Sequence, residues 1–171
     1  MTEIALFAVW IAVCAWISIP MVIPFTLQSM GIFLAVNVLG GKKGTAAVGL
    51  YLLLGIAGIP VFSGFRGGIG VLLGYTGGYL IGFVFTALAM WGIELLLGRK
   101  PWQQVVGMGT GLIIHYVFGT VWYWILYAAQ TKEAGLAAIL GMCVFPFIIP
   151  DLVKLWLALV LGRRLRRAWP V

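Results

Sequence analysis

The sequence predicts an all-α integral membrane protein with six transmembrane helices in a single membrane domain. Two features of the composition carry this prediction: 63% of the 171 residues are hydrophobic, and only 9% are charged. A soluble globular domain has about 45–50% apolar and about 25% charged residues, so a water-soluble fold would expose much apolar surface. One bilayer span needs about 20 apolar residues, so six spans use roughly 120 residues. The remainder suffices for connections but not for a large domain outside the membrane.

Breaks in the apolar runs define the first three candidate helices. The first stops at Pro20 and the third at Pro60, because proline interrupts the helical hydrogen-bond ladder. Gly40-Gly41 ends the second, which is short. Glu3 precedes the first run and no Lys or Arg does, whereas a secretory signal begins with a basic segment. We therefore expect the first run to be a retained span.

The later candidate helices are separated by a glycine-rich connection and by charged turns. Residues 63–70 connect the third helix to the fourth, and the fifth is the longest. The sixth begins near Pro146 to Asp151, and residues 136–144 form either an extra helical turn or its first half. The expected helices cover approximately residues 4–19, 27–39, 45–59, 77–97, 103–128 and 146–161.

Basic residues orient these helices, since cytoplasmic loops carry an excess of Lys and Arg. With the N-terminus in the cytoplasm, eight of the 11 basic residues fall on the cytoplasmic side: Lys42, Lys43, Arg99, Lys100, Arg163, Arg164, Arg166 and Arg167. Arg66 and Lys132 fall in outer loops, with Glu133 beside Lys132. Both termini are thus expected in the cytoplasm. The net charge of +7 is explained by orientation, and nucleic acid is not expected as a partner.

The outer half of the predicted bundle contains most of the helix breakers. In this topology all four Ile-Pro pairs lie at outer helix ends: Ile19-Pro20, Ile23-Pro24, Ile59-Pro60 and Ile149-Pro150. Irregular backbone at membrane depth is tolerated only where protein covers it or where it lines a cavity. We therefore expect a pocket in the outer half and regular helices in the inner half.

Asp151 and Lys154 give the sharpest local signal for chemistry. Both stand in an apolar stretch near the outer start of the last helix, where a charge costs about 2.5–3.5 kcal/mol on insertion scales. Their i, i+3 spacing places them on one helix face. They form either a ligand site, with a carboxylate for N–H donors and an ammonium for an anion, or a structural ion pair.

Arg66 and its glycine-rich surroundings form a second candidate. The guanidinium can bind a substrate carboxylate through two parallel hydrogen bonds, or it is a solvated loop residue. Glycines recur every four residues, at Gly70, Gly74, Gly78 and Gly82. They indicate either close helix packing or a loop whose backbone approaches a ligand.

Other polar and aromatic residues have two interpretations each. Gln28, close to Thr26, binds a ligand or caps the second helix. Tyr79 and Trp122 line a pocket or belong to the core and the interfacial aromatic belt. His115 is the single histidine, so it cannot form a metal cluster, and a helix-packing role is favoured.

Catalytic motifs are absent from the sequence. Glu94 is interpreted as structural, and Cys14 and Cys143 as packing residues in apolar runs. The chain contains no P-loop, no H-E-x-x-H and no G-x-S-x-G motif. We therefore expect no enzyme activity, no metal and no cofactor, and any active transport must draw its energy from an ion gradient or a partner protein.

Four segments together resemble the BioY family, the biotin-binding S components of energy-coupling factor (ECF) transporters. They are Pro24-Phe25-Thr26-Leu27-Gln28, the glycine-rich residues 63–70, Leu73 to Leu80, and Pro146-Phe147 followed by Asp151-Leu152-Val153-Lys154 and a basic tail. The resemblance covers nearly the whole chain in order. Tyr75 stands where the family commonly has proline, and Pro150 where it commonly has glycine; both departures affect the details of affinity more than identity.

The resemblance implies an S-component fold with a site open to the outside of a bacterial cell membrane. It implies biotin as the transported ligand, and a membrane T component with two ATPases as partners. The implied substrate-binding residues are Gln28, Arg66, Gly70, Thr76, Gly77, Tyr79, Asp151 and Lys154. Asp151 suits the two N–H donors of the ureido ring, and Arg66 or Lys154 suits the carboxylate.

A small-residue spacing in the first helix also fits this resemblance. Ala8 and Ala12 form an A-x-x-x-A pattern like the one with which S components contact the T component, or they serve ordinary internal packing. Three other functions remain open: an S component for another vitamin, an intramembrane enzyme, and a structural membrane subunit without a small-molecule pocket.

Overall fold

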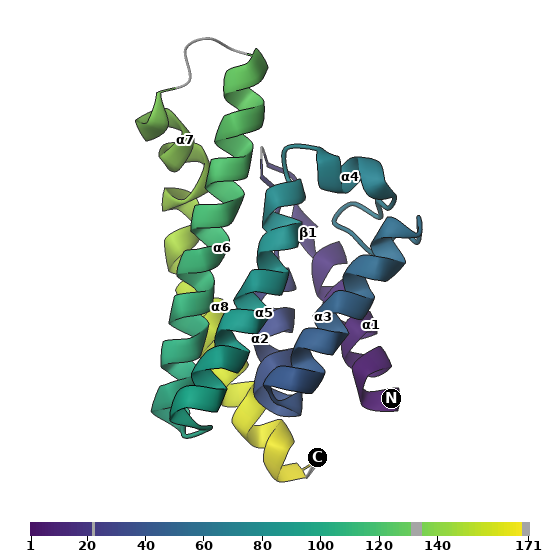
Figure 1. The fold of residues 1–171 in the computed structure, drawn as a ribbon, viewed down its shortest axis with the longest axis vertical. Helices are drawn as coiled ribbons and strands as arrows, with labels where there is room; N and C mark the ends of the chain where they lie inside the picture. Colours follow the sequence, from purple (N-terminus) through teal and green to yellow (C-terminus); the bar gives the residue numbers. More distant parts are fainter. Residues whose placement is uncertain (22, 131–134, 169–171) are drawn as a thin grey trace.

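The computed structural model describes residues 1–21, 23–130 and 135–168, and it is mostly helical (Figure 1). Its helices are α1 (Thr2–Trp16), α2 (Gln28–Leu39), α3 (Gly41–Ile56), α4 (Ile69–Leu73), α5 (Gly77–Leu97), α6 (Pro101–Gln130), α7 (Leu136–Cys143) and α8 (Phe145–Ala168). Two short strands, β1 (Ser18–Ile19) and β2 (Phe25–Thr26), pair antiparallel between α1 and α2. Lys132 and Glu133, which we predict to lie in an outer loop, are outside the described residues.

Each of the six predicted helices has a counterpart, with ends that differ by a few residues except at the last one. The structure separates α7 from α8 at Val144, whose backbone angles (φ −125°, ψ −59°) are not helical, so residues 136–143 form a helix of their own. Helix α8 continues to Ala168, seven residues past the predicted end at 161. Its basic tail contains good helix formers and no proline before Pro170, so nothing stops the helix earlier.

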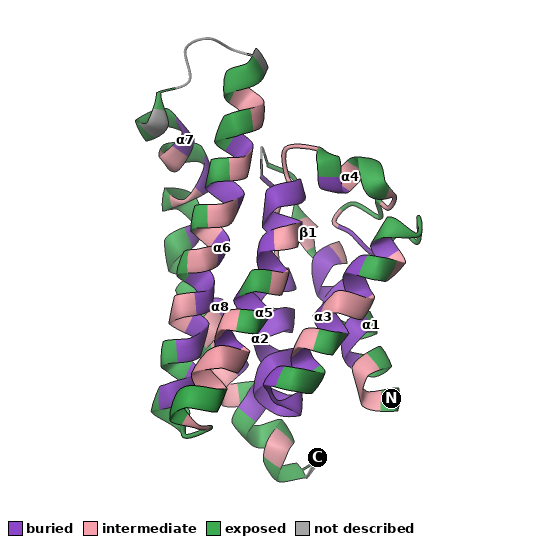
Figure 2. Ribbon diagram, viewed as in Figure 1, coloured by how far each residue is buried: buried purple, intermediate pink, exposed green. Residues whose placement is uncertain are grey.

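Within the described residues, three segments are long and apolar enough to cross a membrane. They are Gly77–Leu97, Pro101–Ala129 and Ala137–Ala168, while Thr2–Trp16 and Gln28–Leu39 are shorter apolar helices. Helix α2 rises about 18 Å, less than the roughly 30 Å of a hydrocarbon core. All twelve of its residues are buried, and it packs against α1, α3, α5 and α8 (Figure 2). It is therefore an internal helix around which the others are arranged.

Small residues let α5 and α6 approach closely along their length. A Cβ atom on Gly78 would lie 2.2 Å from Trp122 Cβ, and one on Gly119 would lie 2.2 Å from a ring atom of Tyr79. The packing interpretation therefore describes the helical part of the glycine repeat. Gly70, in α4, has open space where its Cβ would be, and is exposed.

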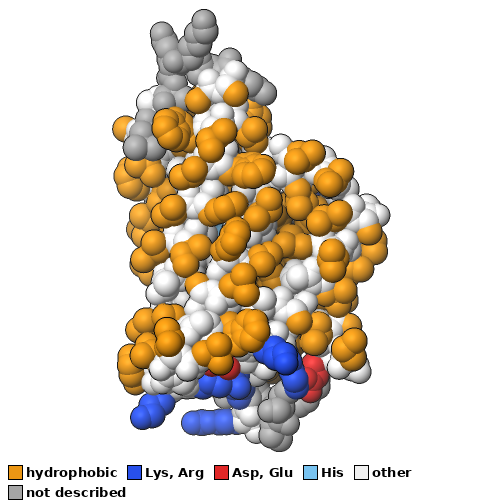
Figure 3. All heavy atoms as spheres, viewed as in Figure 1, with side chains coloured by type: hydrophobic (Ala, Val, Ile, Leu, Met, Phe, Trp, Pro, Cys, Tyr) orange, Lys and Arg blue, Asp and Glu red, His pale blue; other side chains and the backbone are white. Residues whose placement is uncertain are grey.

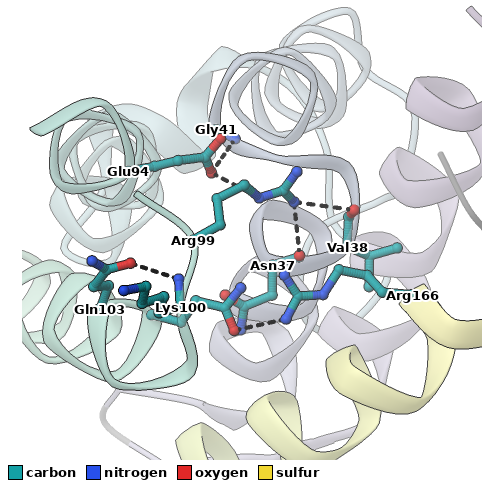
Figure 4. Close-up of polar contacts among 9 residues, drawn as sticks. Asn37, Val38, Gly41, Glu94, Arg99, Lys100, Gln103 and Arg166 are labelled. Atoms are coloured by element: carbon teal, nitrogen blue, oxygen red, sulfur yellow. Dashed lines mark hydrogen bonds and ion pairs between the residues drawn. The ribbon is translucent and has the colours of Figure 1, made fainter. Parts of the chain in front are cut away.

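Charged side chains gather at one end of the molecule, near the C-terminus, while the rest of the visible face is largely hydrophobic (Figure 3). At this end Glu94 accepts a hydrogen bond from the backbone N–H of Gly41 (2.9 Å) and lies 3.6 Å from Arg99 (Figure 4). Arg99 donates to the backbone oxygen of Asn37 (3.1 Å). Glu94 and Arg99 thus satisfy free backbone groups where α2 ends and α3 begins.

The same end also holds α8 in place. Arg166 donates to the side-chain oxygen of Gln104 in α6, at 2.8 Å (Figure 4). Together with Glu94 and Arg99, this contact connects the α2–α3 turn, the α5–α6 turn and the tail of α8. The structural interpretation of Glu94 agrees with these contacts.

The close backbone packing at the start of α5 can be tested with substitutions at two glycines of this helix. A Cβ on Gly77 would lie 1.7 Å from the backbone oxygen of Leu72, whereas Gly92 has nothing within 4 Å. We expect Gly77→Ala to lower the free energy of unfolding by about 1–3 kcal/mol, since the backbone must shift to admit the methyl group. Gly92→Ala is the matched control, and its better helix propensity should make it neutral or stabilising. Thermal unfolding in detergent measures both, and equal midpoints for the two variants would contradict the expectation.

Candidate functional site

A cavity lies between the N-terminal half of α5, the middle of α6, the first half of α8 and the segments before α2 and α4. It contains about 680 Å³ of space between atoms, including a part open to solvent. Its lining combines aromatic and aliphatic side chains with a few buried polar groups, the usual composition of a small-molecule site. The apolar side chains are those of Ile23, Pro24, Phe62, Val71, Leu80, Phe83 and Phe147.

Asp151 and Lys154 lie side by side in the wall of this cavity. Each is 5% exposed, and Lys154 Nζ donates to Asp151 Oδ1 at 2.8 Å. Helix α8 places them together because residues three apart share a face. The structure therefore contains the ion pair and places it at a cavity, so the two interpretations given by the sequence are compatible.

Three further groups complete the surroundings of this pair. Ser29, at the start of α2, donates to Asp151 Oδ1 at 3.1 Å, and Tyr116 of α6 donates to Oδ2 at 2.5 Å. Lys154 Nζ also donates to the Ser29 hydroxyl at 3.4 Å and lies 3.9 Å from the centre of the Phe25 ring, a cation–π contact. Asp151 thus accepts from three donors, and a carboxylate has about four acceptor positions.

Sequence reasoning did not assign roles to Ser29, Tyr116 and Phe25. Ser29 directly follows Gln28 and Tyr116 directly follows His115, so each is adjacent in sequence to a candidate residue. Their contacts with Asp151 and Lys154 join residues far apart in the chain, and no local pattern indicates them. Only proximity to the recognised segments could have drawn attention to them.

Gln28 and Tyr79 both line the cavity and have partners inside the protein. Gln28 Nε2 donates to the hydroxyl of Tyr51 at 3.0 Å, and its backbone N–H donates to Thr26 Oγ1 at 3.3 Å. Gln28 does not cap α2, whose N-cap residue is Leu27 and which has no side-chain cap hydrogen bond, so the capping interpretation is wrong. The ligand-binding interpretation of Gln28 stays a prediction. The hydroxyl of Tyr79 hydrogen-bonds that of Thr120 at 3.2 Å.

Arg66 lies at the exposed rim of the cavity, on the loop between α3 and α4. Its Nε donates to the backbone oxygen of Ser63 at 3.1 Å, and Phe62 and Arg66 pair as an isolated bridge. Thr76 also lines the cavity, while Gly70 lines an adjacent outer hollow that shares Arg66 and Thr76. Gly77 is buried against Leu72 and lines neither space, so its location corresponds to backbone packing.

Two other candidate groups lie away from the cavity. Trp122 is not among the lining residues; its Nε1 donates to the backbone oxygen of Gly74 at 3.1 Å. Ala8 and Ala12 are 1% and 3% exposed and belong to the protein's own core. Their burial agrees with the alternative of internal packing, and docking through these two residues stays a prediction.

His115 combines packing with a place at the cavity. Its ring stacks on Phe83 with centroids 4.2 Å apart, in agreement with the predicted packing role. It also lines the cavity, which the sequence did not predict. Cys14 and Cys143 are buried free thiols, and within the described residues no group of His, Cys, Asp and Glu could hold a metal ion.

Comparison with known proteins places this arrangement in a family. The family model described as "BioY family" matches residues 1–171. The chain belongs to the BioY family. Among BioY proteins, the biotin transporter BioY of Thermotoga maritima is 42% identical over 166 residues, covering 95% of this chain and 92% of the relative. The probable biotin transporter BioY of Pyrococcus horikoshii is 40% identical, covering 95% and 93%.

A solved structure shows the same fold. It is the crystal structure of the S-component for biotin from an ECF-type ABC transporter, with a TM-score of 0.84 and 30% sequence identity. The match covers 97% of this chain and 89% of that one. The resemblance noted in the sequence is thereby confirmed at the level of family and fold.

The contribution of the buried Asp151–Lys154 ion pair to stability can be compared with that of an exposed ion pair. Removing one partner of a buried ion pair leaves an uncompensated charge, so we expect Lys154→Met to lower the free energy of unfolding by about 3–5 kcal/mol. The double variant Asp151→Asn/Lys154→Met should lose much less than the sum of the single variants. Lys43→Met is the control: its bond to Glu3 (2.9 Å) is at the surface, and its loss costs about 1 kcal/mol or less. Additive losses in chemical unfolding would show that the two charges do not interact.

Proposed function

We propose that this chain is the high-affinity biotin-binding S component of an ECF-type vitamin importer. The observation that carries the proposal is the buried Asp151–Lys154 pair, hydrogen-bonded and set in the wall of an otherwise mainly apolar cavity. Membership of the BioY family and the likeness to a biotin S component support the choice of ligand. The chain captures biotin from outside and delivers it with energy from partner ATPases.

Biotin offers groups that match the chemistry of the cavity. Its ureido ring has two N–H donors, and Asp151 retains about one free acceptor position. Its thioether ring is apolar and fits walls such as Phe62 and Phe83. Its carboxylate tail suits Arg66 at the rim, whose guanidinium can donate two parallel hydrogen bonds. In this arrangement the ring system lies at the buried end and the tail points toward the opening.

The remaining site residues have supporting roles in this proposal. Gln28, Thr76 and Tyr79 line the cavity around the ligand, and Lys154 holds the Asp151 carboxylate in position through their hydrogen bond. Gly70 leaves space near the tail, and Gly77 fixes the start of α5. The protein performs no covalent chemistry, so no cofactor is required.

A membrane T component and two ATPases are the partners in this proposal. The likeness to the S component of an ECF-type ABC transporter supports it, as does the lack of a P-loop in this sequence. Docking through Ala8 and Ala12 would require α1 to separate from the core in which both are buried. The outward face of α1, which includes Leu6 and Trp10, is accessible without such a change.

We further propose six spans in a bacterial cell membrane, with both termini in the cytoplasm. The gathering of Lys and Arg at one end and the cavity's broken connections toward the other support this orientation (Figures 1 and 3). Helices α1, α2 and α3 are short, and the irregular segments beside α1 and α2 extend them toward the outer surface.

Cysteine labelling in intact cells tests the orientation. In a variant with Cys14 and Cys143 replaced by alanine, a cysteine at the exposed Ile69 should react with a membrane-impermeant maleimide from outside. Lys100→Cys and Arg163→Cys should react only after the cells are opened, because both lie on the proposed cytoplasmic side. Labelling of position 100 in sealed cells would reverse the orientation.

Equilibrium binding of radiolabelled biotin to detergent-purified protein tests the ligand and the site. We expect tight binding by the wild type and a loss of roughly ten- to a hundredfold in Asp151→Asn and Arg66→Ala, as for charge-assisted hydrogen bonds. The Arg66→Ala loss should disappear with biotin methyl ester, which lacks the charged carboxylate.

Lys100→Ala, a cation removed at the opposite end, is the control and should bind like the wild type. Folded protein that does not bind biotin would contradict the proposal. A panel of other vitamins would then show whether the chain is an S component of different specificity.

A further inference from the structure

His115 is a buried polar residue whose role in the cavity is not explained by packing alone. It is 8% exposed, lies on α6 and lines the cavity together with its neighbour Tyr116. Its ring is held between two aromatic side chains, stacked on Phe83 at 4.2 Å and edge-on to Tyr79 at 5.3 Å. The imidazole therefore has a fixed position in the wall.

One nitrogen of this ring lacks a partner. His115 Nδ1 is buried without a hydrogen bond among the described residues, and nearby Gly82 presents no side chain to it. Buried polar atoms are hydrogen-bonded in the great majority of cases, so an exception in a cavity wall calls for a ligand or a water.

The other buried polar side chains around the cavity behave differently. In the described part of the chain, Gln28 is bonded to Tyr51, Tyr79 to Thr120, and Asp151 to three donors. His115 thus differs from its neighbours: they have internal partners, and it has hydrogen-bonding capacity to spare. An imidazole offers one donor and one acceptor when neutral, which suits an amide-like ligand.

We propose that His115 is a specificity-determining residue that hydrogen-bonds the ureido ring of bound biotin. The inference rests on the proposed function. Asp151 has room for about one more donor, whereas the ureido ring presents two N–H groups and a carbonyl, so a second polar residue is needed to satisfy it. His115 is at the buried end of the cavity, where the ring system lies, and Arg66 is at the exposed rim with the tail.

Binding of biotin and three analogues by His115→Phe tests the proposal. Phenylalanine keeps the stacking on Phe83 and removes both nitrogens. We expect biotin affinity to fall roughly ten- to a hundredfold, the effect of an unpaired polar group in a site built to hydrogen-bond it. Biotin methyl ester and desthiobiotin, which retain the ureido ring, should lose affinity by the same factor. An N-methylated ureido analogue should lose about threefold or less, because its ring contacts are already impaired.

Two controls separate this role from simple packing. Thr86→Val removes a buried polar group from the same α5–α6 interface, where Thr86 donates to Gly111 at 2.9 Å, and it lies outside the cavity lining. It should leave all four affinities unchanged. His115→Gln, which restores a donor and an acceptor, should recover part of the biotin affinity and keeps the test valid if the phenylalanine variant does not fold.

The possible outcomes are distinct. If the wild type binds biotin and His115→Phe binds it equally well, the inference is wrong and the proposed function stands. If the variant loses affinity equally for all four ligands and His115→Gln recovers none, His115 acts through packing and the inference is again wrong. If the folded wild type binds none of the ligands, both the proposed function and the inference fail.

Discussion

A buried ion pair in a largely apolar chain constrains every element that surrounds it. Removing Asp151 and Lys154 from water carries a penalty of several kcal/mol per ion, which is offset only where the pair is well oriented and additionally hydrogen-bonded. Ser29 from α2 and Tyr116 from α6 supply those bonds, and Phe25 from β2 covers the ammonium. Three segments are thus held against α8 at one point, and the cavity is the space between them.

The need to give buried polar groups hydrogen-bond partners also explains why the two ends of the molecule differ. At the charged end, Glu94 and Arg99 satisfy the backbone groups that become free where α2 meets α3, so a tight turn between helices is possible there. At the other end the chain before α2 forms a two-strand hairpin, which brings Phe25 and Ser29 to the pair. The helices at the charged end are thus joined by a closely bonded turn, whereas the irregular segments at the other end line the cavity.

Apolar runs and helix breakers were sufficient to predict the six longer helices, and α5 begins and ends at the predicted residues 77 and 97. The hairpin and the five-residue α4 were not predictable in this way, because tertiary contacts stabilise such short elements. The i, i+3 spacing predicted that Asp151 and Lys154 meet, while the contact of Ser29 with Asp151 spans 122 positions. The A-x-x-x-A spacing predicted that a helix packs closely against Ala8, but not whether that helix belongs to this chain or to a partner.

A fourth hydrogen bond to a carboxylate that already has three donors replaces one from water, so its net contribution is limited to about 1.5–3 kcal/mol. The affinity of such a site must come mainly from burying the apolar part of the ligand against walls such as Phe83, at about 25 cal/mol for each Å² removed from water. The fixed polar groups then select among ligands of similar shape, because a ligand that fails to match them leaves them desolvated and unpaired. Internal bonds hold Asp151 in position before binding, so little of this selectivity is lost to reorganising the site.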